Sequence, residues 1–131
     1  MSGGEVLGVG IDLVDVPRVA AMLERFGDRA LRRILTPGEI AYVTAMARPE
    51  THVAARVAAK EAVFKALQVF PGADAVSWQH LEVVRQESGR PTIVLHGLAA
   101  ELARRHGPWT IHLSLSHAEQ TAGAVALLLR G

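Results

Sequence analysis

The sequence predicts an α+β fold with a mainly antiparallel sheet packed against helices. Short apolar or alternating segments, typical of strands, come in pairs joined by turn residues, and segments with helical periodicity stand between them. The chain has 131 residues, of which 50% are hydrophobic, and this is enough to bury a real core. No linker, repeat or low-complexity tract interrupts it, so we expect one domain over residues 1–131.

The first elements are a strand and a helix. Residues 6–14 are predicted to form a mostly buried strand, because the segment is apolar throughout except for one aspartate. A helix should follow over about 17–30, where Asp15 is the candidate for the cap and Pro17 suits the first turn. The expected core stripe of that helix is Val19, Leu23, Phe26 and Ala30.

Two more helices are predicted before the middle of the chain. Thr36-Pro37-Gly38-Glu39 is a capping box with proline at the first helical position, so a short helix should begin there and end before Pro49. A longer helix over about 50–68 carries both lysines of the chain.

The second half alternates strands with one helix. Ser88-Gly89-Arg90 is a turn signal, and Gly107 is a helix stop. The segment after Gly107 alternates apolar and polar residues cleanly. The expected elements are strands at 78–85 and 92–96, a helix at 98–106, and strands at 109–116 and 123–129.

Composition excludes several classes of function. The formal net charge of +1 and the lack of an aromatic-basic pattern give no case for binding to nucleic acid or to a membrane surface. The chain has no cysteine, which excludes disulfides and thiol nucleophiles and makes the reducing cytoplasm the expected compartment. Residues 1–5 lack the basic start and apolar run of a signal peptide.

The two lysines, set against twelve arginines, lie in the helical stretch 56–67. A lysine kept in such a chain suits a compact point charge, such as a phosphate contact, better than the planar fork of arginine. Glu61 and Lys65 are one helical turn apart, on a face with small side chains at Ala54 and Ala58. They either serve a metal-bound phosphate or form an ordinary helix-surface ion pair.

Asp12 stands inside the otherwise apolar run 8–14. A buried carboxylate must be paired, hydrogen-bonded or metal-bound, because an isolated buried charge is very costly. Helix capping and pairing with an arginine are the competing roles, although Asp15 is better placed to cap. The pair Gly8 and Gly10 does not indicate a dinucleotide site, because Leu13 occupies the position of the third glycine.

Histidines give a third candidate. In the segment 112–117, strand alternation sends His112 and His117 to opposite faces, so they cannot bind one ion together. His117 stands at the end of the strand, as a solvated hairpin histidine would. A serine nucleophile with a histidine base is a further alternative, but the sequence shows no third group to orient the pair.

Three blocks together resemble the holo-[acyl-carrier-protein] synthases. They are Gly10-Ile11-Asp12, then Arg-x-Ala-Ala-Lys-Glu-Ala-x-x-Lys-Ala over 56–66, then His-x-Ser-x-Ser-His over 112–117, and the likeness extends from about Val6 to Leu129. The resemblance implies transfer of the phosphopantetheine arm of coenzyme A to a serine of an acyl carrier protein, with Mg²⁺ required. The alternative is a small oligomeric α+β protein that binds a coenzyme or nucleotide without catalysis.

The resemblance also assigns roles. It implies Asp12 and Glu61 as Mg²⁺ ligands and Lys65 as a catalytic phosphate contact, with Glu61 or a water on the metal removing the proton of the carrier serine. It implies Arg56, Lys60 and His117 as positions near coenzyme A.

The short members of this family resemble one another in forming homotrimers with sites between subunits, and Val14 in place of a second acidic residue places this chain among them. The turn 68–74 departs from the Gly-rich turn that the family often has. A basic stripe beside the core stripe of the first helix is the predicted docking surface for an acidic carrier protein. Its members are Arg18, Met22, Arg25 and Arg29.

Overall fold

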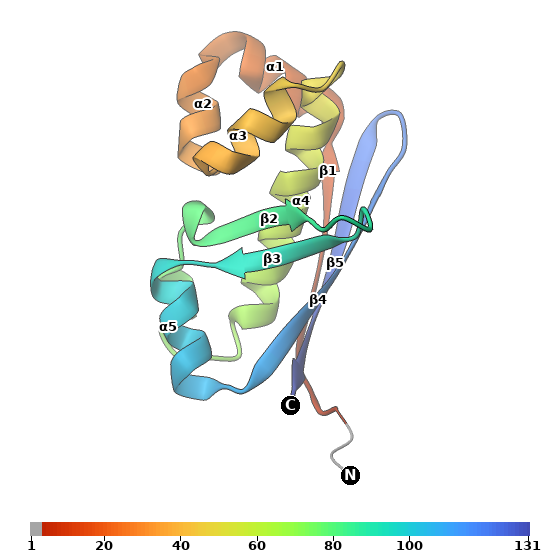
Figure 1. Ribbon diagram of the computed structural model, residues 1–131. Helices are drawn as coiled ribbons and strands as arrows, with labels where there is room; N and C mark the ends of the chain where they lie inside the picture. The colour runs from red at the N-terminus through yellow and green to blue at the C-terminus, as the bar shows by residue number, and fades with distance from the viewer. Residues whose placement is uncertain (1–3) are drawn as a thin grey trace.

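The computed structural model describes residues 4–131 and has two antiparallel sheets with helices on one side (Figure 1), which confirms the predicted fold class. The larger sheet has the strand order β1-β5-β4, and the smaller one pairs β2 with β3. The strands are β1 (Val6–Asp15), β2 (Leu81–Arg85), β3 (Pro91–Leu95), β4 (Trp109–His117) and β5 (Thr121–Arg130). The helices are α1 (Val16–Phe26), α2 (Asp28–Ile34), α3 (Pro37–Thr44), α4 (Pro49–Leu67) and α5 (Gly97–His106), with short 3₁₀ turns η1 (Ala73–Ala75) and η2 (Trp78–His80).

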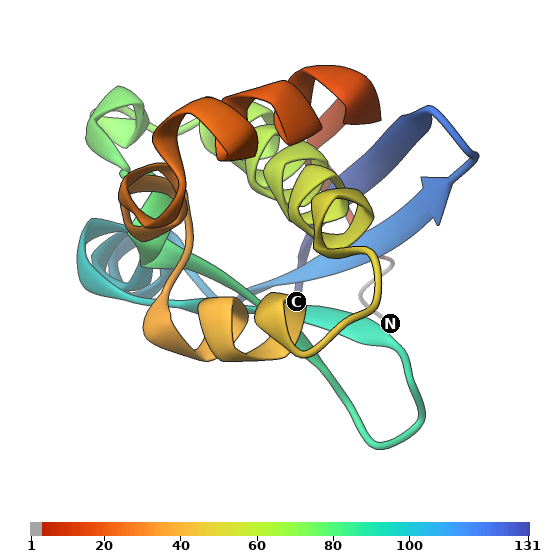
Figure 2. The same cartoon turned by 90° about the horizontal axis from the view of Figure 1, so that it is seen from above.

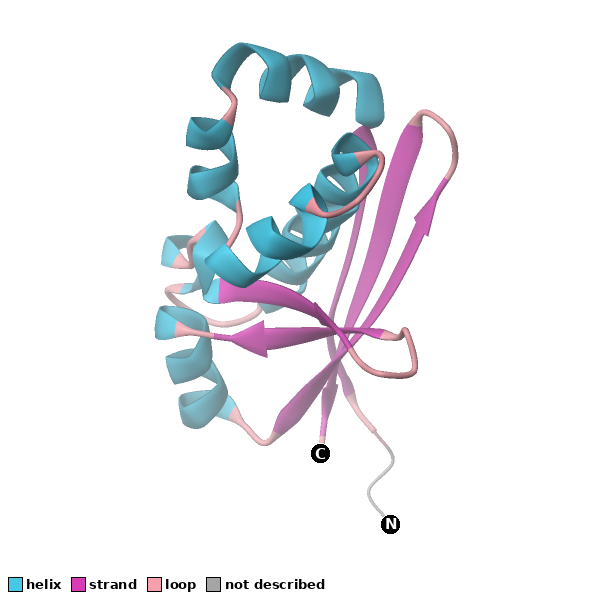
Figure 3. Cartoon of the chain, turned by 45° about the horizontal axis from the view of Figure 1, so that its top comes forward, coloured by secondary structure: helices cyan, strands magenta, loops and turns pink. Residues whose placement is uncertain are grey.

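Helix α4 lies at the centre of the molecule. Figure 2 shows it between the larger sheet and the remaining helices, and Figure 3 shows α1, α2 and α3 gathered around one end of it. One core cluster fills the space between α4, the sheets and α5, and a second packs α1, α2 and α3 against the start of α4. None of the helices within residues 4–131 has the length and apolar character needed to cross a membrane.

Strand β1 is not mostly buried, contrary to the expectation from its composition. Its side chains alternate, and Val9, Ile11 and Leu13 are 62, 61 and 71% exposed on the side away from α4. An apolar run can therefore be a strand that buries only one face within a single chain.

The other face of β1 touches α4 directly. A Cβ atom added to Gly10 would overlap the carbonyl oxygen of Ala62, and one added to Gly8 would overlap that of Ala66. Glycine on the strand and alanine on the helix thus bring the two backbones together, and this close approach places residues of β1 beside residues of α4.

The prediction of one helix over 17–30 is wrong, because the segment forms two helices, α1 and α2. Gly27 adopts a φ of 55°, a value that favours glycine, and α1 ends there. Asp15 precedes α1 but makes no side-chain capping bond, so its predicted capping role is not observed. Of the expected core stripe, Val19 and Ala30 are buried, whereas Phe26 is 50% exposed.

The capping box at Thr36 is confirmed. The hydroxyl of Thr36 accepts a bond of 3.2 Å from the backbone N–H of Glu39, and the Glu39 carboxylate accepts one of 2.9 Å from the N–H of Thr36. This reciprocal pair begins α3 at Pro37, as predicted.

The later elements follow the prediction except near Trp78. Residues 78–80 form the 3₁₀ turn η2, and the strand begins at Leu81 instead of Trp78. Helix α5 ends before Gly107 as expected, and β4 alternates as expected between exposed and partly buried side chains. The last strand is longer than predicted, because β5 pairs with β1 and β4 along its whole length.

Candidate functional site

Asp12, Glu61 and Lys65 meet where β1 crosses α4, and we call these three residues the Asp12 cluster. The ammonium of Lys65 lies 3.3 Å from Oδ1 of Asp12 and donates a bond of 3.0 Å to the carbonyl oxygen of Ile11. The Asp12 side chain is 20% exposed and that of Lys65 is 51% exposed, so both face solvent. Of the alternatives weighed for Asp12, the structure supports neither a helix cap nor an arginine partner.

The surroundings of Glu61 shift the pKa of its carboxyl group. Burial raises the pKa of Glu61, the negative charge of Asp12 raises it further, and the ammonium of Lys65 lowers it. Lys65 forms its ion pair across to Asp12 and not along its own helix, so the simple Glu61–Lys65 surface pair is not observed.

Two neighbouring carboxylates suit a hard divalent cation. Mg²⁺ binds proteins through one or two carboxylates and keeps several waters. Burial and the charge of Asp12 both raise the pKa of Glu61, and a cation here would offset the repulsion between the two carboxylates. Among residues 4–131 no group of three or more metal-binding side chains gathers. The donor set fits Mg²⁺.

An open groove of about 620 Å³, the Asp12 groove, borders the two carboxylates of the cluster. Asp12 and Glu61 line it from one side, and Arg18 and Met22 of α1 line it from the other. Glu61 also borders a smaller adjoining pocket lined by Phe64, Asp74, Val76, Ser77, Trp78 and Leu81. No sequence pattern predicted that pocket, because its walls come from segments that are adjacent only in the fold.

His117 lies elsewhere, in a second groove of about 600 Å³ that we call the His117 groove. Its other walls include Arg48, Thr51 and His52 at the start of α4. Burial lowers the pKa of His52, and the nearby positive charges of Arg56 and Arg85 lower it further. These basic groups make the His117 groove suitable for an anion, although within one chain it contains no member of the Asp12 cluster.

Arg56 lies behind the His117 groove and is only 3% exposed. Its guanidinium stands 4.3 Å from the centre of the Tyr42 ring, and Nη1 donates to the carbonyl oxygen of His52 at 3.5 Å. In this position Arg56 supports the groove wall, and its predicted contact with coenzyme A stays a prediction.

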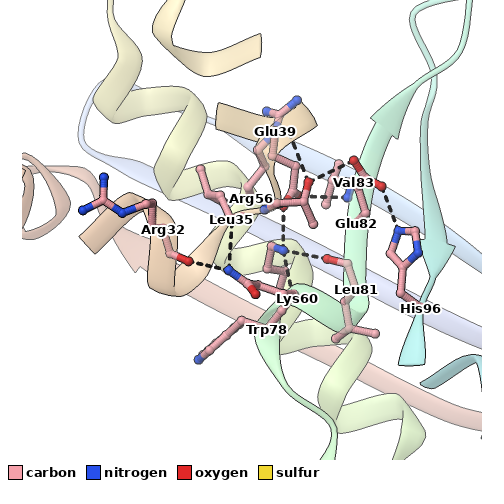
Figure 4. A network of polar contacts seen from close by, with 12 residues as sticks. Arg32, Leu35, Glu39, Arg56, Lys60, Trp78, Leu81, Glu82, Val83 and His96 are labelled. Atoms are coloured by element: carbon pink, nitrogen blue, oxygen red, sulfur yellow. Dashed lines mark hydrogen bonds and ion pairs between the residues drawn. The ribbon is translucent and has the colours of Figure 1, made fainter. Parts of the chain in front are cut away.

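Lys60 is not brought to either groove. Figure 4 shows its ammonium among Glu39, Trp78 and Leu81, and its side chain is 0% exposed. The geometry therefore gives no support to a direct contact between Lys60 and coenzyme A. Two lysines five residues apart on one helix face different surroundings.

The predicted docking residues are divided between two helices. Arg18 and Met22 border the Asp12 groove, and Arg25 stacks on the ring of Phe26 at 5.1 Å. Arg29 belongs to α2, so the break at Gly27 interrupts the expected stripe. Met22 also lines an apolar groove with Phe26, Ala30, Arg33, Ile34 and Trp78, which sequence analysis did not anticipate.

Comparison with known proteins places these features in a family. Residues 8–126 match the model of the 4'-phosphopantetheinyl transferase superfamily. A holo-[acyl-carrier-protein] synthase of Koribacter versatilis is 49% identical over 123 residues, covering 94% of this chain and 98% of that protein. The crystal structure of holo-[acyl-carrier-protein] synthase from Neisseria meningitidis has a TM-score of 0.85 at 29% identity, covering 95% of this chain and 98% of the other. The ACPS–CoA complex of Chronobacterium ammoniagenes has a TM-score of 0.81 at 34% identity, covering 97% and 99%.

Proposed function

The chain belongs to the 4'-phosphopantetheinyl transferase superfamily, and from this premise we propose that it is an enzyme that transfers the phosphopantetheine arm of coenzyme A to a serine of an apo acyl carrier protein. The observation that carries the proposal is the Asp12 cluster, because two carboxylates at one open groove, with an ammonium paired to one of them, suit a pyrophosphate with a divalent cation. The similarity to a structure of a synthase–coenzyme A complex supports coenzyme A as the donor.

The residues of the cluster have distinct roles in this reaction. Asp12 and Glu61 would hold Mg²⁺, which when bound neutralises pyrophosphate charge. The serine oxygen forms a bond to the β-phosphorus of coenzyme A, and the bond from that phosphorus to the bridging oxygen breaks. Glu61 takes the serine proton, and Lys65 stabilises the charge that develops on the departing adenosine 3',5'-bisphosphate.

We further propose that the active form is a homotrimer. Val9, Ile11 and Leu13 on β1 form an exposed apolar surface with Val125 of β5, which pairs with Ile11 in the sheet and is 41% exposed. Exposed apolar surface of this kind is typical of a protein interface. The Asp12 groove and the His117 groove share no residue within one chain, and we propose that association through this face joins the two for a ligand as long as coenzyme A.

The carrier protein would dock on α1 and the start of α2. Arg18 and Met22 already border the Asp12 groove, so a carrier bound to Arg18, Met22, Arg25 and Arg29 would present its serine near Glu61. Basic residues attract an acidic carrier helix, and Met22 supplies an adaptable apolar contact between them. A single domain over residues 1–131 and a cytoplasmic location remain part of this proposal.

The deciding experiment is mass spectrometry of an apo acyl carrier protein incubated with the chain, coenzyme A and Mg²⁺. Transfer adds the phosphopantetheine mass to the carrier, and changing the modified serine to alanine should prevent it. Binding of coenzyme A without any mass increase would favour the non-catalytic binding protein instead.

A further inference from the structure

Lys60 uses all of its hydrogen-bonding capacity inside the protein. An ammonium has three donors. Here Nζ lies 2.7 Å from Oε1 of Glu39, 2.8 Å from the carbonyl oxygen of Trp78 and 2.6 Å from that of Leu81 (Figure 4). No donor is left for a phosphate, and the side chain has no exposed surface from which to reach one.

The partner of Lys60 is equally saturated. The carboxylate of Glu39 is buried, with Oε1 accepting also from the backbone N–H of Thr36 at 2.9 Å and Oε2 accepting from the N–H of Val83 at 2.8 Å. Lys60 and Glu39 therefore connect α4 to three other segments, namely α3, η2 and β2.

Helix α4 is held on one side by β1, whose Gly8 and Gly10 rest on the backbone of Ala66 and Ala62. Six of the eleven buried residues of α4 are alanines, whose short side chains interlock little with a neighbouring surface. Directional bonds from Lys60 supply a fixed orientation, because each carbonyl and carboxylate partner belongs to a different segment. A buried ion pair often adds little net stability over an apolar pair of similar size, whereas removing one partner is strongly destabilising because it leaves a buried charge unpaired.

Glu61 follows Lys60 directly on the helix, and Lys65 lies one turn beyond Glu61. Rotation of α4 about its axis would move both side chains relative to Asp12, which is carried by β1 and not by the helix. A side-chain displacement of about 1 Å at a reacting centre can lower a rate about 100-fold. A change in the orientation of α4 should therefore change the rate of the reaction.

We propose that Lys60, held by Glu39, is a positioning residue that sets the rotation of α4 and so places Glu61 and Lys65 against Asp12. This role rests on the proposed transfer reaction. It differs from the coenzyme contact expected from the sequence, because Lys60 acts on the reaction only through its neighbours on the helix.

The test uses Lys60→Met and Glu39→Gln in the full chain. Glu39→Gln is nearly isosteric and retains the ammonium and its two carbonyl partners, so it decides the question even if Lys60→Met does not fold. The matched control is Val63→Ala, which creates a cavity at another fully buried position of α4 without altering the ion pair.

Four quantities are measured for each protein: the midpoint of thermal unfolding, kcat, the KM for coenzyme A, and the Kd for Mn²⁺ from the electron paramagnetic resonance signal of the free ion. Both variants are expected to lower kcat at least tenfold and to weaken Mn²⁺ binding at least fivefold, with the KM for coenzyme A within twofold of wild type. Val63→Ala should lower the unfolding midpoint as much as Lys60→Met and Glu39→Gln do, while changing kcat less than threefold.

Three outcomes would overturn the proposal. A higher KM for coenzyme A in Lys60→Met alone, with kcat unchanged, would restore the direct coenzyme contact. A folded Glu39→Gln protein with wild-type kcat and Mn²⁺ affinity would contradict the positioning role. The same conclusion would follow if Val63→Ala lost as much kcat as the other two variants for the same fall in unfolding midpoint. A wild-type chain without transfer would contradict the proposed function, and the Mn²⁺ affinities would still decide whether Lys60 positions Glu61.

Discussion

The ammonium of Lys65 lies 3.3 Å from Oδ1 of Asp12, and this pair joins the last turn of α4 to β1. The two residues are far apart in the sequence, and they meet because Gly10 lets β1 rest directly on the backbone of α4 at Ala62. The ion pair is partly exposed, so its own contribution to stability is small. Its importance is that it marks where a phosphate and a cation would bind.

Removal of either carboxylate should stop transfer. Asp12→Asn and Glu61→Gln each leave one carboxylate for the cation, and we expect transfer to fall by a factor on the order of 100 or more, as for a lost electrostatic stabiliser. The assay is carrier modification at saturating Mg²⁺. Glu87→Gln, in the exposed turn between β2 and β3, is the control and should keep the wild-type rate. A near wild-type rate in Asp12→Asn would contradict the assignment.

Glu61 should destabilise the metal-free protein at neutral pH. A pKa raised in the folded state means that the stability from protonated Glu61 is present at low pH and is lost as the pH rises through that folded pKa. Without Mg²⁺, Glu61→Gln should therefore unfold at a temperature higher by about 1–4 °C at pH 7, and this difference should vanish in acid. The measurement is thermal unfolding with a chelator across pH. A lower midpoint for the variant at pH 7 would contradict the raised pKa.

Lys65→Ala should lower kcat by a factor on the order of 100, because it removes the positive charge next to the departing phosphate. Lys65→Arg should restore only part of the rate, since the planar guanidinium differs from the ammonium in geometry. Steady-state kinetics with a fixed excess of Mg²⁺ measure both. An unchanged kcat in Lys65→Ala would show that Lys65 only forms a surface ion pair with Asp12 and has no role in catalysis.

Charge on the open face of β1 should prevent assembly. Ile11→Lys places an ammonium at the centre of the exposed apolar surface, and we expect wild-type protein at three times the 14.0 kDa chain mass and the variant as an inactive monomer. Light scattering gives the masses. Val84→Lys, on an exposed apolar position of β2 outside that face, is the control and should remain a trimer. An active wild-type monomer would contradict the proposed interface on β1.

Charge reversal on α1 should weaken carrier docking. Arg18→Glu with Arg25→Glu is expected to raise the KM for the carrier about tenfold at low salt, make that KM less dependent on salt, and leave coenzyme A binding unchanged. Kinetics at two ionic strengths measure the effect, and Arg104→Glu on α5 is the control. If the double variant kept its KM at low salt, the docking surface would lie elsewhere, with Arg32 and Arg33 the next candidates.

The sequence by itself determined most of the kinds of element, and the family pattern in it pointed to Asp12, Glu61 and Lys65. Local signals were sufficient for the capping box at Thr36, because its two bonds join residues three positions apart. The resemblance to the family grouped Asp12, Glu61 and Lys65, whereas their spacing alone left an ordinary surface ion pair open. Such features depend on neighbouring residues or on a recognisable pattern.

Only the tertiary structure decided which face of each element is covered and which lysine faces solvent. Lys60 and Lys65 have similar neighbours in the sequence. Five residues along a helix nevertheless point a side chain to a different side, where residues of other segments form its environment. Glu39, Trp78 and Leu81 enclose Lys60, whereas β1 leaves Lys65 half-exposed beside Asp12. The exposure of Ile11 and the separation of His117 from Asp12 have the same cause, since burial and distance arise from packing between segments remote in sequence.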